Sequence, residues 1–571
     1  MTLLILISLI SVFLWIGKGD FYTKGEPREA SVAVSMIEKN QWILPEVYAG
    51  EIAYKPPLTH WLISVFSLPQ GKVTPFSSRL PSALAFLGLV VFSFVFFGKN
   101  LKFQDAFLAA LIMLTSFELH RGAMTARVDM LLAFLIVLAL TRLFRWEERK
   151  KLKGFPFFIT IILGLATLTK GPIGIILPLL VFGVYLLLLR YNFRKVAGKL
   201  LPIALASLIL PFIWYILAYQ TGGKAFFDIV WAENFGRFFG MENLNIDYSL
   251  GHEEPWWYNF ATLLGGFIPW TILLFISLFT IRYSKKIPGI KMLWRLFIRQ
   301  NKIKLFSAVA AIVIIGFYCI PLSKRSVYLM PAYPFISIFI AQYVLYLTEY
   351  KITTSRIFNI FIGILASVLS LIVLLTVIFP VIDPVRLASV FTRHEKTLTD
   401  IGTIWQSFHS SKIVYALLLC VLVFSIYILF KYLRKKNYLK ALYATIGAYL
   451  AILLVLDGSF LPAYKDGISV KPMAKSIRNN YPVKEDNLFA MCNLKEYSNM
   501  YGLNFYLHNH LRDFEKEQPG EGFFLTGSNS FEKVSEKYGK VYRFILLEEY
   551  KNKSRDGEKV IQLYSFKKSE P

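Results

Sequence analysis

Long apolar stretches alternate with short polar connections over the first 457 residues of the chain. A helix of about 20 apolar residues crosses the hydrocarbon core of a bilayer. Thirteen stretches approach that length: 2–17, 82–98, 104–118, 128–144, 155–169, 172–189, 200–219, 258–281, 304–321, 327–347, 357–380, 412–430 and 440–457. The pattern predicts a mainly helical, polytopic membrane protein with about thirteen spans. The first stretch has neither a basic leader nor a small-residue cleavage site, so we expect a span there rather than a cleaved signal peptide.

The basic residues of the connecting loops predict the orientation of these spans. Lysine and arginine are retained on the cytoplasmic side of a membrane. They cluster in every second group of loops, at Arg145, Arg149, Lys150, Lys151 and Lys153, at Arg190, Arg194, Lys195 and Lys199, between Arg282 and Lys304, and between Lys431 and Lys440. We therefore expect a cytoplasmic N-terminus, with loops 18–81, 119–127, 220–257, 322–326 and 381–411 and the C-terminal region on the outer side.

The amino-acid pattern changes after residue 457. Residues 458–571 contain 18 Lys or Arg and 15 Asp or Glu, a nearly neutral balance typical of a soluble domain. Short β-like runs alternate there with polar helical stretches. We predict that residues 1–457 form the transmembrane domain, and that residues 458–571 form a small outer α/β domain.

The residue patterns of two outer loops indicate that they are more than simple linkers. In loop 18–81, apolar residues recur at helical intervals in 28–38 and again in 58–66, which predicts two short interfacial helices. Loop 220–257 mixes charged and aromatic residues. Together these loops are expected to build a polar chamber on the membrane surface.

Composition and charge support this interpretation. The chain of 571 residues is 55% hydrophobic and only 18% charged, which excludes an ordinary soluble enzyme. Its formal net charge of +26 would suggest a nucleic-acid partner in a soluble protein, but here the basic residues lie between apolar runs and follow the topology rule. The three cysteines are far apart and indicate neither a disulfide framework nor a cysteine zinc site.

Ionisable residues near a membrane are costly, which makes them functional candidates. Most of them lie at the outer ends of the spans: Asp20, Glu26, Arg28, Glu29 and Lys55 in loop 18–81, then Arg127, Asp129, Lys170, Glu233, Arg237, His252, Lys324, Arg325 and Tyr328. A carboxylate can accept the proton of an attacking hydroxyl. Fixed cations can stabilise the charge on a departing phosphate. The set therefore predicts group transfer from a lipid phosphate at the bilayer surface.

Seven short motifs, in this order, resemble a known family. They are GEPREA at 25–30, NQWILP at 40–45, YKPPLTHW at 54–61, RVDM at 127–130, TKGP at 169–172, HEEPWWY at 252–258 and KRSVYLMPAYP at 324–334. The sequence resembles the membrane glycosyltransferases of the GT-C fold, in particular the lipid A aminoarabinose transferase and the protein O-mannosyltransferase-like family 39. The motifs cover about residues 1–350.

The resemblance implies an inverting transfer of a sugar from a polyprenyl-phosphate donor to lipid A, a glycan or a protein at the periplasmic face of a bacterial inner membrane. It also implies that Lys55, Lys170, Arg237 and Tyr328 lie at the donor phosphate and that Asp129 is a site carboxylate. Arg325 is added as a phosphate ligand, because its short outer loop is basic against the topology rule.

The sequence departs from the family at two places. The first-loop Asp-Glu pair of the family reads Gly25-Glu26 here, so Glu26, or in the alternative Asp20, is expected to serve as the catalytic carboxylate, with Asp129 as its partner. A divalent metal, bound by some members, is disfavoured because Tyr54 and Asn234 replace a family Glu and His. His252 is the remaining candidate, either as a metal ligand or at the acceptor.

Simpler interpretations stay open for several residues. Glu26 would pair with Arg28 on a surface, and Asp129 would cap a helix. Lys55 and Lys170 would extend toward the interface, and Tyr328 would belong to an aromatic belt. A multi-span transporter or lipid flippase is the alternative function, disfavoured because such proteins place their polar groups near mid-membrane and commonly have repeated halves.

Overall fold

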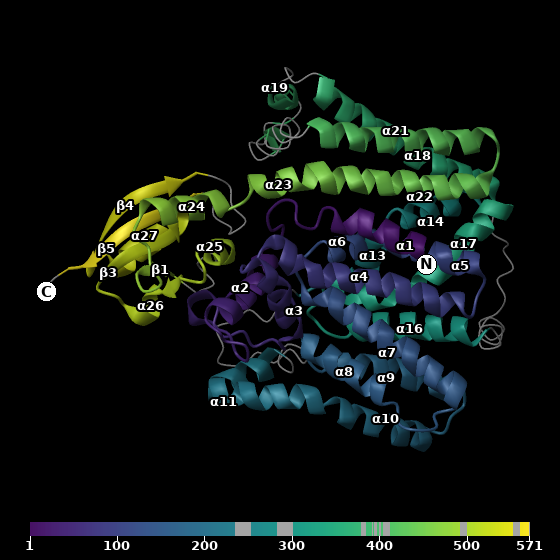
Figure 1. The fold of residues 1–571 in the computed structure, drawn as a ribbon, viewed down its shortest axis with the longest axis horizontal. Helices are drawn as coiled ribbons and strands as arrows, with labels where there is room; N and C mark the ends of the chain where they lie inside the picture. The colour runs from purple at the N-terminus through teal and green to yellow at the C-terminus, as the bar shows by residue number, and fades with distance from the viewer. Residues whose placement is uncertain are drawn as a thin grey trace.

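The computed structural model is an elongated molecule with a helical bundle at one end and a small sheet domain at the other (Figure 1). It describes residues 1–233, 253–281, 301–378, 384–390, 392, 397–398, 401–402, 412–491, 500–551 and 560–569. Between the bundle and the sheet domain lie α2 (Gly25–Glu38) and α3 (Leu58–Ser67), the two helices of loop 18–81.

Apolar helices run side by side through the bundle. Seven helical runs in the described residues are long and apolar enough to cross a membrane, and two bent pairs bring the number to nine. The helices of the first half are α1 (Thr2–Ser8), α4 (Pro75–Gly98), α5 (Phe103–Thr115), α6 (Phe117–Ala123), α7 (Val128–Lys150), α8 (Phe157–Lys170), α9 (Ile173–Leu188), α10 (Phe193–Ser207) and α11 (Ile209–Trp231). Those of the second half are α13 (Tyr258–Gly266), α14 (Trp270–Thr280), α16 (Lys302–Cys319), η5 (Ser326–Ala332), α17 (Tyr333–Tyr350), α18 (Ile352–Ile378), α19 (Pro384–Ser389), α21 (Lys412–Arg434) and α22 (Tyr438–Val455).

These helices confirm a polytopic membrane protein, while thirteen crossings stay a prediction. Besides the nine runs, four shorter apolar helices cover Thr2–Phe13, Phe103–Thr115, Phe157–Lys170 and Ile173–Leu188. Each of the thirteen predicted stretches therefore coincides with an apolar helix or bent pair. The four short ones fall below the length of a straight span.

A sharp bend brings chemistry to one end of the bundle. α6 and α7 meet at 114°, and the short connection between them contains Arg127. Asp129 follows in the first turn of α7, where a carboxylate interacts favourably with the helix dipole. The bend therefore presents a polar segment at the end of the bundle that faces the sheet domain.

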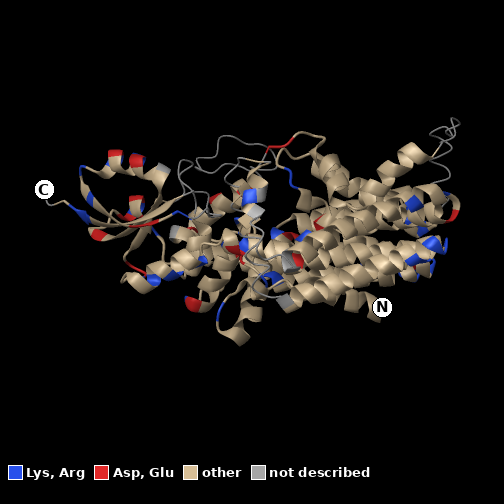
Figure 2. Ribbon diagram, turned by 90° about the horizontal axis from the view of Figure 1, so that it is seen from above, with Lys and Arg blue, Asp and Glu red and all other residues tan. Residues whose placement is uncertain are grey.

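Charge is distributed unevenly along the molecule. Lys, Arg, Asp and Glu gather at the end of the bundle far from the sheet domain and again where the bundle meets that domain, with an almost uncharged stretch between (Figure 2). An apolar zone between two charged ends is the distribution expected for a protein embedded in a bilayer.

The sheet domain continues from the last long helix. α22 runs through η6 (Leu456–Phe460) into α23 (Leu461–Gly467). The helices that follow are α24 (Lys471–Asn480), α25 (Tyr501–Tyr506), α26 (Phe514–Glu517) and α27 (Ser528–Tyr538). The five strands are β1 (Leu488–Ala490), β2 (Arg512–Asp513), β3 (Glu521–Gly527), β4 (Tyr542–Tyr550) and β5 (Ile561–Lys568), in the order β2-β1-β3-β5-β4. β1 pairs in parallel with β2 and β3, whereas β5 pairs antiparallel with β3 and β4.

The sheet domain is firmly docked on loop 18–81. Tyr48 is fully buried within the core of the domain, among residues of α24, α25 and β3. The Asn509 amide donates to the Ser31 carbonyl oxygen and to Ser35 Oγ of α2, both at 2.8 Å. The docking places the start of α25 beside α2, at the edge of the cavity described next.

Candidate active site

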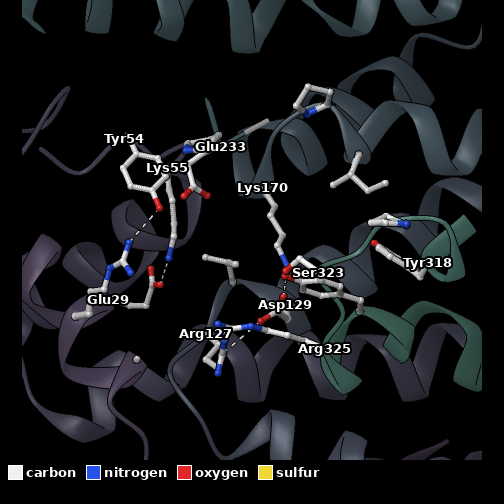
Figure 3. A pocket seen from close by; sticks show the side chains of 18 of the residues that line it. Glu29, Tyr54, Lys55, Arg127, Asp129, Lys170, Glu233, Tyr318, Ser323 and Arg325 are labelled. Atoms are coloured by element: carbon white, nitrogen blue, oxygen red, sulfur yellow. Dashed lines mark hydrogen bonds and ion pairs between the residues drawn. The ribbon is translucent and has the colours of Figure 1, made fainter. Parts of the chain in front are cut away.

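A cavity of about 720 Å³ opens where the bundle, loop 18–81 and the sheet domain meet. Its walls come from α2, the segment 54–56, the α6–α7 bend, the α8–α9 turn, the segment from Phe317 to Tyr328, and Tyr501 of α25. Figure 3 shows Glu29 and Lys55 on one side, and Asp129, Lys170, Arg127 and Arg325 on the other. Segments separated by up to several hundred residues thus converge on one site.

Asp129 forms the first charged centre of the cavity. Lys170 contacts its Oδ1, and Arg127 Nε lies 3.3 Å from its Oδ2. The carboxylate is buried, with 5% exposure, whereas the lysine and arginine side chains stay partly exposed to the cavity. The pair of cations compensates the cost of burying this charge.

The motif TKGP explains how Lys170 reaches the cavity. Lys170 is the last residue of α8, and Gly171 follows with φ +87°. A side chain at that position would be strained, so glycine allows the chain to reverse before Pro172, the N-cap of α9. The Lys170 ammonium lies 4.0 Å from the ring centre of Tyr328 in η5, a cation–π contact.

The short connection before η5 adds a further cation. Arg325 and Tyr328, two of the phosphate candidates from the sequence, both line the cavity. Lys324 points elsewhere: its ammonium donates to the carbonyl oxygen of Glu254 at 2.9 Å and is buried. Only the second of these two neighbouring cations is therefore available to a ligand.

Glu29 forms the second charged centre; the sequence named it among the ionisable residues of loop 18–81 but gave it no role. Lys55 contacts its Oε1, and His60 Nε2 lies 2.7 Å from its Oε2. Burial alone would raise the pKa of Glu29, but Lys55, His60 and Arg28 hold that pKa well below its usual range. Glu29 is therefore an anion at neutral pH.

The spacing of α2 explains why Glu29 rather than Glu26 faces the cavity. Gly25, Arg28 and Glu29 line it, and residues at i, i+3 and i+4 share one face of a helix. Glu26 follows Gly25 by one position, so its side chain turns by about 100° toward α4. The resembling family has an aspartate at the position of Gly25. Glu29 lies one helical turn after that position, on the same face of α2. This spacing was the signal in the sequence that could have identified it.

The expectation that Glu26 faces the site is wrong. Glu26 is fully buried and is not part of the cavity wall. Its Oε1 accepts from Arg79 Nε at 2.8 Å and from the Ala126 amide at 3.1 Å, and its Oε2 accepts from the amides of Tyr22 and Thr23. A carboxylate with four donors inside the protein fixes loops rather than contacting a substrate. The alternative of a surface pair with Arg28 is also wrong.

The lining of the cavity also includes apolar side chains of the bundle. Ile173 and Ile176 belong to α9 and Phe317 belongs to α16. Lys24, Arg28 and Tyr501 of the lining come from loop 18–81 and α25. The cavity therefore combines hydrocarbon-compatible side chains with hydrophilic ones.

Two predicted site residues, Arg237 and His252, lie outside the described residues. The described residues contain no group of three His, Cys, Asp or Glu side chains that could hold a metal ion. Tyr54, at the position of a family glutamate, accepts a hydrogen bond from Arg28 Nη2 at 3.2 Å. The residues that the structure describes thus do not fit a divalent metal.

The fold identifies the class of protein. The crystal structure of ArnT from Cupriavidus metallidurans bound to undecaprenyl phosphate superimposes over 99% of this chain and 97% of its own, with a TM-score of 0.67 and 16% identity. This protein is therefore an integral membrane protein of the GT-C fold.

Sequence comparison identifies the family. The family model described as dolichyl-phosphate-mannose-protein mannosyltransferase matches residues 54–215. The undecaprenyl phosphate-alpha-4-amino-4-deoxy-L-arabinose arabinosyl transferase 2 of Proteus mirabilis (strain HI4320) is 26% identical over 63% of this chain and 62% of its own length. An uncharacterised protein of Aquifex aeolicus (strain VF5) is 30% identical over 56% of this chain and 74% of its own length. The chain belongs to the family 39-like membrane glycosyltransferases.

The match to the first curated relatives is partial. It spans 63% and 62% of their lengths, just under two thirds.

Proposed function

We propose that this protein transfers a sugar from a polyprenyl-phosphate donor to a lipid A, glycan or protein acceptor at the periplasmic face of a bacterial inner membrane. One observation carries the proposal: the cavity is lined by apolar side chains and also by lysine and arginine side chains around two buried carboxylates. A polyprenyl chain suits the apolar side chains, and its phosphate suits the cations.

The reaction follows from the chemistry of these groups. The acceptor hydroxyl oxygen attacks the anomeric carbon of the sugar, and the bond from that carbon to the phosphate oxygen breaks. The phosphate leaves with the bonding electrons, while the hydroxyl proton passes to a carboxylate. Attack opposite the leaving group inverts the anomeric centre.

Cations and a tyrosine hydroxyl along the cavity would hold the leaving phosphate. We assign this role to the cations Lys55, Lys170 and Arg325 and to the hydroxyl of Tyr328, all in the lining, and Arg237 stays a prediction from the motif. His252 likewise stays a candidate for the acceptor. Fixed cations lower the barrier because they face the charge that develops on the phosphate.

Asp129 and Glu29 are the proposed carboxylates. Each contacts a lysine that a phosphate would also attract, Lys170 for Asp129 and Lys55 for Glu29. Binding of the donor would draw a lysine toward the phosphate and free a carboxylate oxygen for the acceptor hydroxyl. Glu29 thereby takes the role that the sequence had assigned to Glu26.

Removal of each carboxylate in the full-length protein tests this function. The protein is reconstituted in liposomes with a polyprenyl-phosphate sugar and a bacterial envelope fraction as acceptor, and loss of donor sugar is measured. Glu29→Gln and Asp129→Asn should each lower transfer by about 100-fold or more, with binding of undecaprenyl phosphate retained. Glu38→Gln, on the same helix but outside the cavity, is the matched control and should transfer normally.

The result separates the alternatives. Full transfer by both cavity variants would remove the proposed mechanism. Movement of the labelled lipid across the bilayer without loss of its sugar would instead identify a flippase.

A further inference from the structure

The sheet domain contributes a residue to the cavity. Tyr501, the first residue of α25, lies in the lining. Its Oη donates to Glu51 Oε2 at 3.2 Å, and the preceding Met500 amide donates to Tyr48 Oη at the same distance. Tyr501 is thus anchored to loop 18–81 from two sides.

Tyr501 and Tyr54 bracket the Arg28 guanidinium. The guanidinium carbon lies 5.9 Å from the ring centre of Tyr501 and 6.0 Å from that of Tyr54. Both distances are typical of cation–π contacts. The Arg28 Nη2 group donates to Tyr54 Oη. The guanidinium therefore already has a defined position, and a ligand need not order it.

Arg28 keeps hydrogen-bonding capacity for a ligand. Throughout the described part of the chain, no carboxylate forms an ion pair with it, whereas Glu29 and Asp129 each have a lysine partner. A guanidinium carries five N–H donors in a planar fork. Its position in the lining directs this capacity toward the cavity.

The bracketed arginine and the apolar lining residues belong to different elements. Arg28 and Tyr501 come from α2 and α25, which contact each other, whereas Ile173, Ile176 and Phe317 come from the bundle helices α9 and α16. The apolar side chains of the bundle suit the donor lipid. The part of the lining at the seam between α2 and α25 is then left for the second substrate.

We propose that Arg28, Tyr54 and Tyr501 form the acceptor subsite, so that the sheet domain takes a direct part in recognising the acceptor. The acceptor would present oxygen atoms, from hydroxyl, carboxylate or phosphate groups, to the Arg28 fork, and Tyr501 would hold that fork in place. This inference rests on the proposed function, because it needs a donor bound in the same cavity.

Two measurements on the full-length protein test the subsite. Transfer is followed while a bacterial envelope fraction is titrated as the acceptor, and undecaprenyl phosphate binding is followed separately. Tyr501→Ala should raise the half-saturating amount of envelope fraction at least tenfold, with binding of undecaprenyl phosphate unchanged within twofold. Tyr501→Phe, which keeps the ring but not the bond to Glu51, and Arg28→Lys, which keeps the charge but not the fork, should give intermediate values.

Tyr481→Ala is the matched control. Tyr481 belongs to the same domain, packs on its core and lies outside the cavity lining, so its loss should change neither measurement. The subsite is refuted if Tyr501→Ala leaves the acceptor dependence unchanged, or if it weakens undecaprenyl phosphate binding as strongly as transfer. Absence of transfer by the unsubstituted protein would contradict the proposed function itself, and the subsite with it.

Discussion

Two glutamates on one turn of α2 have opposite surroundings. Glu26 accepts four hydrogen bonds inside the protein, and Arg79, its ionic partner, is fully buried with it. Arg79 also donates to the carbonyl oxygens of Ile16, Gly19 and Asp20. Glu29, three residues later, borders the cavity. The first carboxylate holds loops together, and the second is accessible to a substrate.

Substitution of Glu26 should therefore affect folding before it affects chemistry. Glu26→Gln leaves the Arg79 charge buried without its counter-ion, which typically costs about 3–5 kcal/mol. We expect a marked fall of the melting temperature in detergent. Glu26→Leu combined with Arg79→Leu should recover part of it. An unchanged melting temperature together with lost transfer would contradict a structural role.

The pKa of Lys55 gives a second prediction. Burial lowers this pKa below the ordinary 10.5, the neighbouring Arg28 and Arg127 lower it further, and Glu29 only partly offsets them. Lys55 is charged below its pKa, so its attraction for a phosphate is present at neutral pH and is lost as the pH rises through the lowered value.

The pH dependence of donor use tests this. The KM for the donor, measured from about pH 7 to about pH 10, should rise at alkaline pH. In Lys55→Arg the rise should move to higher pH, because a guanidinium stays charged there. If KM rises over the same alkaline pH range in the unsubstituted protein and in Lys55→Arg, a group other than Lys55 titrates there.

At the residue level, sequence patterns identified the cations better than the acids. Lys55, Lys170, Arg325 and Tyr328 were predicted and line the cavity. Glu29 and Tyr501 were not assigned a role. Glu26 and Glu29 are both buried but face different surroundings, because they lie on different faces of α2. The start of α2 sets which residue faces the cavity, and the sequence does not fix that start. Tyr501 reaches the site through a contact with Glu51, 450 positions away in the chain.

Among the elements, the α8–α9 hairpin positions a cation most directly. The two helices approach closely at Gly174, where an added Cβ would lie 2.4 Å from the backbone of Ala166 and Thr167. Backbone atoms cannot move aside as a flexible side chain does. The separation of α8 and α9, and with it the place of Lys170, depends on this glycine.

Gly174→Ala should push the helices apart. We expect a loss of about 1–3 kcal/mol in stability and a reduced affinity for undecaprenyl phosphate, measured by thermal unfolding and by ligand binding. Gly198→Ala in α10 is the control, because nothing lies within 4 Å of an added Cβ there. Equal stability and equal affinity for undecaprenyl phosphate in the two variants would argue against a close approach of α8 and α9 at Gly174.

The apolar pattern predicted where the membrane helices lie along the chain, but it did not predict the sharp bends between them. Each predicted stretch coincides with an apolar helix, because hydrocarbon-length runs leave few alternatives. The 114° bend between α6 and α7 and the 100° bend between α13 and α14 were not predicted. Helix packing in three dimensions decides such bends, and hydropathy along the chain does not record it.

For the whole molecule, charge predicts the orientation. The basic residues Lys435 and Lys436 lie in the connection from α21 to α22, and loop 18–81 and the sheet domain lie at the other end of the bundle (Figures 1 and 2). From the positive-inside rule we therefore predict that the sheet domain and the cavity lie outside the cytoplasm.

Cysteine labelling tests the orientation. With the native cysteines replaced by serine, Lys540→Cys in the sheet domain should react with a membrane-impermeant maleimide on intact spheroplasts. Lys435→Cys should react only after permeabilisation; both lysines are exposed. The reverse pattern would put the cavity on the cytoplasmic side.

The docking of the sheet domain was beyond sequence analysis. The composition marked a soluble C-terminal region, but its attachment depends on specific pairs: Asp20 contacts Tyr506 and Ser469, and Tyr48 fills a gap in the core of the domain. Such pairs lie more than 400 residues apart and follow no periodic pattern.

The division of the cavity has an evolutionary consequence. The apolar lining residues Ile173, Ile176 and Phe317 belong to the bundle, whereas Arg28, Tyr54 and Tyr501 of the proposed acceptor subsite belong to loop 18–81 and the sheet domain. Diversification toward new acceptors would thus require these two segments to be inherited together as a cassette. Swapping either one alone between relatives would leave Tyr48, Asp20 and Asn509 opposite foreign partners, and such chimaeras should fail in assembly before they reveal any change of specificity.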